Sequence, residues 1–310
     1  MSDNLPTQVE SRAGVRFVET PGLKAVIERA MLYLNAGLPI NLSGPSGIGK
    51  TTLALHLGHL LKRPVVLIPG DEELGSGDMS GGLFGYRRRR VIDTFVHTVR
   101  KTEDDLLELW ADSRLTAACR NGYTLVYDEF TRSRPEANNA LLSVLEEGML
   151  FFSNRRGDES YVPVDPRFRA IFTSNPLEYS GTHRSPDALL DRLVTLHLDY
   201  YDEETETAIT ASRSGLDRHS AGWIVRLVRL ARAHPALKGR VSTRACLKIA
   251  QVMHARHTRP DPNDRLLYAI CRDVLGSAGD SIAEEEEAAI KVLWDRSFEG
   301  FQPPERGRKL

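Results

Sequence analysis

The sequence is poor in cysteine, carries almost no net charge and lacks long apolar runs. Its three cysteines, Cys119, Cys246 and Cys271, form no C-x-x-C pair, which argues against a zinc site or a disulfide framework and predicts packed, reduced thiols. The formal net charge of −1 gives no overall attraction to nucleic acid or membranes. No run approaches the ~18 apolar residues of a membrane span, and no secretory signal is present. We therefore expect a cytoplasmic globular protein with no membrane span and no nucleic-acid partner.

The chain is long enough to bury a large core and a second, smaller domain. It has 310 residues, of which 41% are hydrophobic and 27% are charged, as in folded proteins. Strand-like apolar runs are confined to the part before residue 200, and helical patterns follow one another after it. We predict an α/β core, a parallel sheet flanked by helices, over residues 15–200 and a small all-α lid over 201–297, with flexible segments at 1–14 and 298–310.

Residues 44–51 read Gly-Pro-Ser-Gly-Ile-Gly-Lys-Thr and match the pattern G-x-x-x-x-G-K-[ST]. An apolar run at 38–42 predicts a strand before this loop, and leucines at helical spacing predict a helix behind it. In that setting backbone N–H groups and the helix N-terminus cradle phosphates, Lys50 neutralises the β- and γ-phosphates, and the Thr51 hydroxyl can ligate Mg²⁺. The flanking strand and helix disfavour the alternative, a glycine-rich turn without a ligand. We predict that ATP and Mg²⁺ bind, with the nucleotide contacted by Gly44, Pro45, Ser46, Gly47, Ile48, Gly49, Lys50, Thr51 and Thr52.

Two adjacent carboxylates, Asp128 and Glu129, follow the β-rich run at 123–127. At the carboxyl end of a parallel strand the chain turns, so both side chains can reach the crevice in which such sheets bind ligands. Asp128 would then hold Mg²⁺ through water or Thr51, and Glu129 would polarise the attacking water. Taken alone, the pair is equally compatible with solvated carboxylates. Its place downstream of the phosphate loop favours the catalytic interpretation.

Three further runs complete the predicted sheet. Residues 65–68 and 194–198 are short and apolar, as in strands covered on both faces. The β-rich run at 169–174 ends at Asn175, whose amide can donate and accept hydrogen bonds and so can orient a water against a γ-phosphate. An Asn-Pro pair by itself is more often a turn. Aromatic and β-branched residues on both sides of the polar segment 153–160 predict a hairpin.

The segment between the second and third predicted strands has a less regular pattern. Its glycines predict a mobile, exposed loop over 70–86. The four arginines at 87–90 are either a solvated face or a contact for an acidic partner or a neighbouring subunit. Residues 94–118 have a helical pattern. The buried stripe of that helix would consist of Leu106, Leu107 and Trp110.

Five helices are predicted after residue 200, at 203–213, 223–234, 242–257, 265–275 and 282–294. Ser242 is a favourable N-cap residue for the third of them. Arg244 lies in the first turn of that helix, where positive charge opposes the helix dipole, and this indicates another use such as pairing with phosphate. A surface salt bridge is the alternative. The acidic run at 284–287 complements the dipole of the last helix.

Together these motifs resemble those of the AAA+ ATPases of the MoxR type, a group of P-loop NTPases. The resemblance is carried by the phosphate loop, Asp128-Glu129, the hairpin between Phe151 and Val164, Asn175, Arg192 and Arg244. The residues at 17–21, 127–139 and 172–176 are similar to those of one branch of this group, the gas vesicle assembly ATPases called GvpN.

The resemblance implies a role for each of these motifs. It makes the phosphate loop Walker A and the acidic pair Walker B. Asn175 would be sensor 1 and Arg244 sensor 2, and Arg192 would be an arginine finger that acts in a neighbouring subunit's site. The implied catalytic residues are Glu129, Asn175, Arg192 and Arg244, and the implied metal ligands are Thr51 and Asp128.

The same resemblance implies the assembly and the partners of the chain. It predicts a homo-oligomer, a hexameric ring, with an insert at 78–85 and the hairpin at 151–164 facing its pore. The partners would be structural or assembly proteins of gas vesicles. ATP hydrolysis would remodel or chaperone these proteins in the cytoplasm, in association with gas vesicles.

Three other functions fit parts of the sequence. A MoxR-type ATPase that activates a metabolic enzyme or inserts metal into it, as in the CbbQ and NorQ relatives, shares every catalytic residue and differs in sequence only around residues 130–139. A nucleic-acid motor or clamp loader would need basic stripes with interleaved aromatics, and only residues 87–90 qualify. A nucleotide-binding switch without hydrolysis is disfavoured by Glu129 and Asn175 together.

Overall fold

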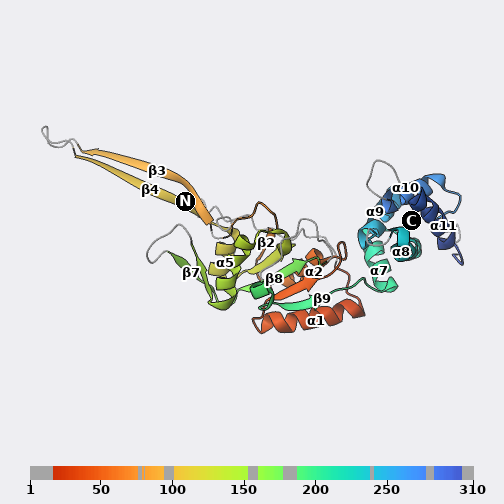
Figure 1. Cartoon of the computed structure of the whole chain (residues 1–310), viewed down its shortest axis with the longest axis horizontal. Helices are drawn as coiled ribbons and strands as arrows, with labels where there is room; N and C mark the ends of the chain where they lie inside the picture. Colours follow the sequence, from red (N-terminus) through yellow and green to blue (C-terminus); the bar gives the residue numbers. More distant parts are fainter. Residues whose placement is uncertain are drawn as a thin grey trace. The chain divides into compact units, whose positions relative to one another are not determined.

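The structure is a computed structural model of the chain (Figure 1). It describes residues 17–75, 79, 81–93, 101–152, 160–176, 187–237, 241–276 and 283–301, with the backbone alone for 81–93, 101–112 and 187. The described residues form two compact units. The first includes Arg29–Ser43 and Thr51–His197, and the second includes the described parts of Arg12–Glu28, Gly44–Lys50 and Leu198–Leu310. The predicted division of the chain at residue 200 stays a prediction.

A five-stranded parallel sheet forms the centre of the first unit, and its strands β2, β8 and β9 are labelled in Figure 1. The strand order is β2-β5-β8-β1-β9. Its strands are β1 (Ile40–Ser43), β2 (Val65–Pro69), β5 (Thr124–Asp128), β8 (Arg169–Ser174) and β9 (Val194–His197). The residues of β1 are buried throughout, as expected of a parallel strand that is covered on both faces. The predicted α/β fold with a parallel sheet is therefore confirmed, and each predicted strand is present.

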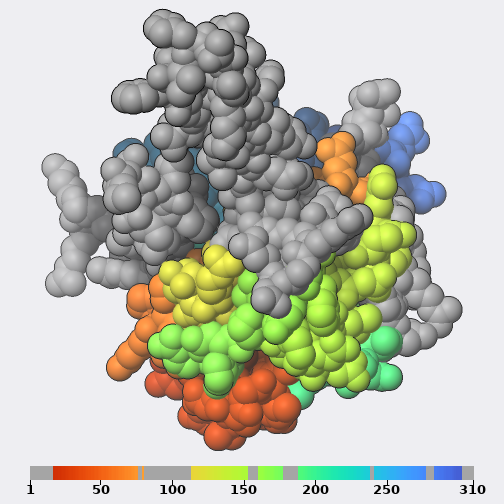
Figure 2. All heavy atoms as spheres, turned by 90° about the vertical axis from the view of Figure 1, so that its left-hand side faces the viewer, coloured from red at the N-terminus to blue at the C-terminus, as the bar shows by residue number. Residues whose placement is uncertain are grey.

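Helices and aromatic rings pack on this sheet. The first unit contains α4 (Arg114–Asn121), the short turn η1 (Phe130–Arg132), α5 (Pro135–Glu146) and α6 (Asp187–Leu190), while α1 (Pro21–Asn35) and α2 (Lys50–Leu60) contribute residues to both units. Phe130 and Phe172 are fully buried and meet edge to face with ring centroids 5.4 Å apart. The described residues between Arg114 and Ser174, yellow to green in Figure 2, form a continuous packed surface.

Residues 81–93 and 101–112 pair as the two strands of a hairpin, so two predictions for this part of the chain are wrong. β3 (Gly81–Asp93) and β4 (Lys101–Asp112) pair antiparallel as a separate two-stranded sheet (Figure 1). The loop predicted over 70–86 is a strand from Gly81 onward, and the helix predicted over 94–118 is a strand over its middle part. Among the described residues of the range 94–118, only those from Arg114 onward, in α4, have the predicted helical conformation.

The physical reason is that strand pairing overrides local helix propensity. The leucines and glutamates of β4 favour a helix when read alone. In the hairpin register Arg89 and Arg90 lie opposite Asp105 and Asp104, and oppositely charged residues at facing positions stabilise antiparallel strands. This complementarity links residues at both ends of the segment, so a local periodicity cannot reveal it. The predicted stripe of Leu106, Leu107 and Trp110 lies outside the described side chains.

The hairpin predicted on both sides of residues 153–160 is confirmed. β6 (Met149–Phe151) and β7 (Tyr161–Pro163) pair antiparallel, with Phe151 opposite Tyr161. The two ring centroids are 6.2 Å apart, and the residues are 47% and 43% exposed. The residues at 153–159 that join the strands lie outside the described part of the chain. The hairpin therefore presents an exposed aromatic pair.

Helices make up the second unit after the sheet ends. They are α7 (Glu203–Ser214), α8 (Arg218–Ala233), the turn η3 (Pro235–Leu237), α9 (Thr243–Ala255), α10 (Arg265–Leu275) and α11 (Glu284–Ser297) (Figure 1). All five predicted helices are therefore confirmed. Aspartates or Ser242 cap α7, α8, α9 and α10 by accepting backbone N–H hydrogen bonds. A membrane-spanning helix is absent from the part of the chain that the structure describes.

The three cysteines lead to a prediction about thiol chemistry. Cys119, Cys246 and Cys271 have no exposed surface, and burial raises the pKa of each thiol to about 12. Because the thiolate is the reactive form, we expect no thiol of the native protein to react rapidly with Ellman's reagent at about pH 8. All three should react after unfolding in guanidinium chloride. A rapid reaction of the native protein would contradict this burial.

Candidate nucleotide-binding site

Three strands bring predicted motifs to one edge of the sheet. β1 leads into the phosphate loop, β5 ends at Asp128, and β8 is followed directly by Asn175. β8 pairs in parallel with both β1 and β5, so their carboxyl ends point in the same direction. Ligands of open parallel sheets bind at this edge. The topology therefore gathers residues that are far apart in the sequence.

The loop from Gly44 to Gly49 has a backbone that suits glycine. Gly47 and Gly49 have φ angles of 78° and 95°, in the region that disfavours side chains. Lys50, the first residue of α2, is 6% exposed, and its Nζ donates to the carbonyl oxygens of Gly44 and Pro45, each at 2.8 Å. The loop thus curls around an ammonium group at a helix N-terminus, which is the arrangement that a phosphate cradle needs.

Hydroxyl groups hold Asp128 at the end of β5. Thr51 Oγ1 donates to Asp128 Oδ1 at 2.7 Å, and Thr173 Oγ1 of β8 donates to the same oxygen at 2.6 Å. The Thr173 hydroxyl also accepts from the backbone N–H of Glu129 at 2.8 Å. Burial raises the pKa of the preceding Tyr127 to about 12, so this phenol stays neutral. Asp128 is therefore oriented by two hydroxyls that come from different elements.

Glu129 has an unusual backbone for a residue that is not glycine. Its φ is 53° and its ψ is 42°, in the left-handed region, a conformation that is uncommon outside glycine, asparagine and aspartate and is found at functional sites. Its carboxylate pairs with Arg132 at 2.9 Å, with side chains 30% and 45% exposed. An ion pair that is this accessible to water contributes little stability. The carboxylate can therefore exchange this partner at small energetic cost.

Asn175 and Arg192 lie in the first unit in different surroundings. Asn175 is 8% exposed and follows the last residue of β8. The Arg192 guanidinium donates to the carbonyl oxygen of Ala188 in α6 and forms an ion pair with Glu146 at the end of α5. These contacts attach Arg192 to α5 and α6, whereas Asn175 lies at the strand edge that carries Asp128.

Arg244 belongs to the second unit, as does the phosphate loop. It is an exposed residue in the first turn of α9, where the Ser242 side chain accepts from its backbone N–H. A Cβ atom added to Gly47 would lie 2.5 Å from Ser242 Oγ and 3.2 Å from Arg244 Cγ. The start of α9 therefore packs against the phosphate loop, and only glycine fits at position 47.

The donor set fits a magnesium nucleotide. Among the described residues no group of three or more His, Cys, Asp and Glu side chains is arranged to hold a metal ion. Mg²⁺ in nucleotide sites needs fewer protein ligands, because water and substrate phosphates complete its shell. The Thr51 hydroxyl donates a hydrogen bond to Asp128, which leaves the lone pairs of its oxygen available for a cation.

Comparison with known proteins identifies the family. An AAA domain of the dynein-related subfamily matches residues 39–193. The chain is 45% identical to the gas vesicle ATPase GvpN of Ancylobacter aquaticus over 290 residues, which are 92% of this chain and 81% of the relative. The chain belongs to the gas vesicle ATPase GvpN family. It is accordingly an AAA-type ATPase, and the resemblance inferred from its motifs is confirmed.

More distant proteins share the fold. The NorQ protein of Paracoccus denitrificans is 28% identical over 69% of this chain and 73% of its own length. The structure of NtrX from Brucella abortus in complex with ADP superposes with a TM-score of 0.50 at 16% identity, covering 92% of this chain and 66% of that one. The similarity to NtrX supports the P-loop fold alone, and the identity to NorQ is much lower than that to the GvpN relative.

Sequence reasoning missed Thr173, the second hydroxyl that holds Asp128. In the register of β5 and β8, Tyr127 lies opposite Phe172, so the next residues along, Asp128 and Thr173, come together at the strand ends. Thr173 could have been found from its position, because it lies two residues before Asn175 on a strand that ends at the same edge of the sheet. Without the strand order, nothing placed this strand beside Asp128.

The contacts of Thr173 in this GvpN-family ATPase lead to a second prediction. Replacing Thr173 by valine removes the hydrogen bonds to Asp128 and to the Glu129 backbone while keeping the side-chain volume. We expect the ATPase rate to fall about 10- to 100-fold, the usual effect of losing a group that orients a metal ligand. Steady-state phosphate release measures this effect.

Two control variants also change a threonine side chain. T173S keeps the hydroxyl and should retain most of the activity. T195V changes a threonine of β9, whose hydroxyl accepts a long hydrogen bond of 3.5 Å from Asn41, and should leave the rate nearly unchanged. Full activity of T173V would show that the hydroxyl does not orient Asp128.

Proposed function

We propose that this chain binds and hydrolyses Mg²⁺-ATP with residues 44–52, Asp128 and Glu129, and that hydrolysis remodels proteins of gas vesicle assembly. The observation that carries the catalytic part is the 2.7 Å hydrogen bond between Thr51 and Asp128. It joins the two sequence motifs that a P-loop ATPase needs. Family membership carries the biological part.

Each residue of the proposed site has a role that its contacts support. The N–H groups of the phosphate loop and the Lys50 ammonium would hold the β- and γ-phosphates. Thr51 and Asp128 would hold Mg²⁺, which supplies positive charge to the phosphate oxygens. Glu129 would break its ion pair with Arg132, orient the attacking water and accept a proton from that water. Asn175 would fix the same water by hydrogen bonding.

We place the arginine finger at Arg192 and its action in a neighbouring subunit. Phosphoryl transfer gains most from positive charge on the γ-oxygens, and an arginine supplied from another subunit accelerates it by about 10³- to 10⁵-fold. Arg192 is 29% exposed and is held by Glu146, itself 58% exposed, so the guanidinium lies within reach of an adjoining molecule. This supports a homo-oligomeric ring, proposed to be hexameric.

The proposed client is a protein of the gas vesicle. The GvpN relative is named for its gas vesicle ATPase activity, and the 45% identity exceeds the 28% identity to NorQ, so activation of a metabolic enzyme is the less supported function. The exposed rings of Phe151 and Tyr161 form a surface that a client chain can contact. ATP hydrolysis in the ring would change the conformation or the assembly of that client.

The proposed role of Glu129 gives the third prediction. E129Q keeps the shape of the side chain but removes its capacity to accept a proton, so turnover should fall at least about 100-fold while ATP still binds. Phosphate release and equilibrium binding of a fluorescent ATP analogue measure the two effects. E136Q, a change of the same kind at an exposed residue in the first turn of α5, should leave both nearly unchanged.

The same two variants test the biological role. In a host that lacks its own copy of this gene, E136Q should restore buoyant, gas-filled cells and E129Q should not. Restoration by E129Q would show that hydrolysis is not needed for gas vesicle assembly. Failure of both variants and of the unmodified chain would exclude the proposed gas vesicle role in that host.

The proposed action of Arg192 in a neighbouring subunit's site gives the fourth prediction. R192A should bind nucleotide normally and hydrolyse it very slowly, like E129Q. Mixing the two inactive variants should restore activity, because about a quarter of the sites in randomly mixed rings combine an intact Glu129 with a neighbour's intact Arg192. No gain of activity on mixing, in rings shown to exchange subunits, would contradict action in a neighbouring site.

A further inference from the structure

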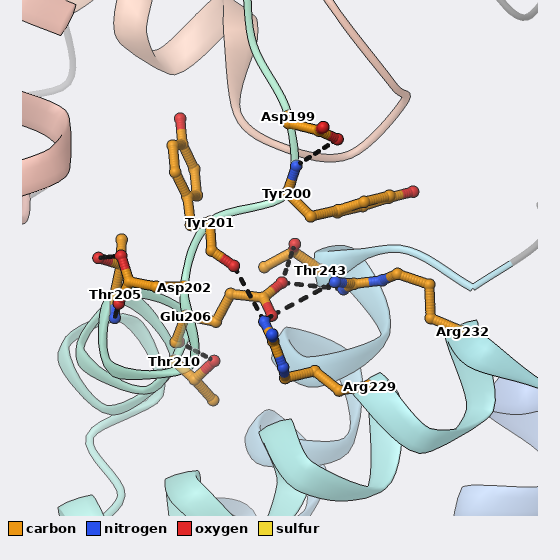
Figure 3. Close-up of polar contacts among 10 residues, drawn as sticks. All are labelled: Asp199, Tyr200, Tyr201, Asp202, Thr205, Glu206, Thr210, Arg229, Arg232 and Thr243. Atoms are coloured by element: carbon orange, nitrogen blue, oxygen red, sulfur yellow. Dashed lines mark hydrogen bonds and ion pairs between the residues drawn. The ribbon is translucent and has the colours of Figure 1, made fainter.

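Glu206 of α7 is a carboxylate with no exposed surface. Four donors surround it, and each of its oxygens accepts two hydrogen bonds (Figure 3). Arg232 binds it through two nitrogens, at 2.8 Å and 3.3 Å, and Arg229 donates to it at 3.0 Å. The Thr243 hydroxyl donates to Oε1 at 2.7 Å. The buried charge is therefore fully paired and hydrogen-bonded.

The two arginines also hold the segment that leaves the sheet. Arg229 donates to the carbonyl oxygen of Tyr201 at 2.9 Å, and the Arg232 guanidinium lies 3.7 Å from the centre of the Tyr200 ring (Figure 3). A stacked, partly desolvated guanidinium interacts favourably with such a ring. Glu206 thus joins four segments of the second unit: the linker before α7, α7 itself, α8 and the start of α9.

The start of α9 is the segment with a functional neighbour. Thr243, which is 4% exposed, is its first residue and Arg244 its second. The same turn packs against the phosphate loop, where a Cβ on Gly47 would meet Ser242 and Arg244. An arginine in a first helical turn opposes the helix dipole, so the position of Arg244 is not explained by helix stability.

Stability alone does not account for the buried cluster either. Replacing a buried ion cluster by apolar side chains of similar size often leaves a protein equally stable or makes it more stable. A cluster of this kind does, however, impose one geometry, because each donor must meet its acceptor at a defined angle. Glu206 is therefore suited to set the position of the element that Thr243 begins.

We propose that Glu206 is a positioning residue for nucleotide binding, which it performs by holding Thr243 and therefore Arg244 against the phosphate loop at Gly47. This proposal rests on the proposed function, in which Arg244 contacts the bound phosphates. The linker of Tyr200 and Tyr201 shares the arginines of Glu206, so movement of the linker reaches Arg244 through the same cluster.

A double-mutant cycle tests the proposal. T243V removes the hydroxyl but leaves Glu206 with both arginines, so the fold should be retained. The dissociation constant of a fluorescent ATP analogue with Mg²⁺ should rise at least about fivefold in T243V. In the R244A background the same change should have no further effect, because there is no guanidinium left to position. T243S should restore the affinity of the unmodified chain.

T210V is the matched control. Thr210 is fully buried on α7, and its hydroxyl donates to the backbone carbonyl oxygen of Glu206 within the same helix. The variant loses a buried hydroxyl that contacts Cys246 of α9 but does not bind the Glu206 carboxylate, so its affinity should stay within about twofold of the unmodified chain. E206Q, run through the same cycle with R244A, provides a second route to the result and should behave as T243V does.

The outcomes separate this proposal from the proposed function. If the unmodified chain neither binds nor hydrolyses the nucleotide, the proposed function fails. If R244A binds as tightly as the unmodified chain, or if the T243V effect persists in R244A, the site stands and the positioning proposal is overturned. Unfolding of both T243V and E206Q, seen by thermal melting without nucleotide, would also overturn it, because the cluster would then serve the fold alone.

Discussion

The candidate site depends on the hydrogen bond between Thr51 and Asp128. It joins the first turn of α2 to the end of β5, which are 77 residues apart in the chain. The bond forms because parallel pairing through β8 sets the ends of β1 and β5 at one edge of the sheet. Because all the strands run in one direction, the chemical groups that follow them collect on one side.

The residues around that bond show unfavourable local conformations. Gly47 and Gly49 adopt φ angles that suit only glycine, and Glu129 adopts a similar angle although it has a side chain. These conformations are stable because neighbouring contacts enforce them, among them the hydrogen bond from the Glu129 N–H to Thr173. The sheet and its buried aromatic core supply the rigidity that a preorganised site requires.

The helical unit contains a buried network of charged side chains around Glu206. Glu206 and its two arginines link the linker after the sheet to the first turn of α9. Both oxygens of the Glu206 carboxylate are paired, so displacing one of its partners breaks a strong hydrogen bond to a charged group. Because the same two arginines hold the linker and Glu206, the network ties the linker to the first turn of α9 within the second unit.

The sequence by itself determined the five parallel strands, the five C-terminal helices and the phosphate loop, because each is encoded by neighbouring residues through periodicity, caps and glycine positions. Only the tertiary structure decided the β3–β4 hairpin, the hydroxyl of Thr173 on Asp128 and the pairing of Thr243 with Glu206. Those contacts join residues 45 and 37 positions apart in the last two cases. Their energy comes from strand register and burial, which exist only once the chain has folded and which no local pattern contains.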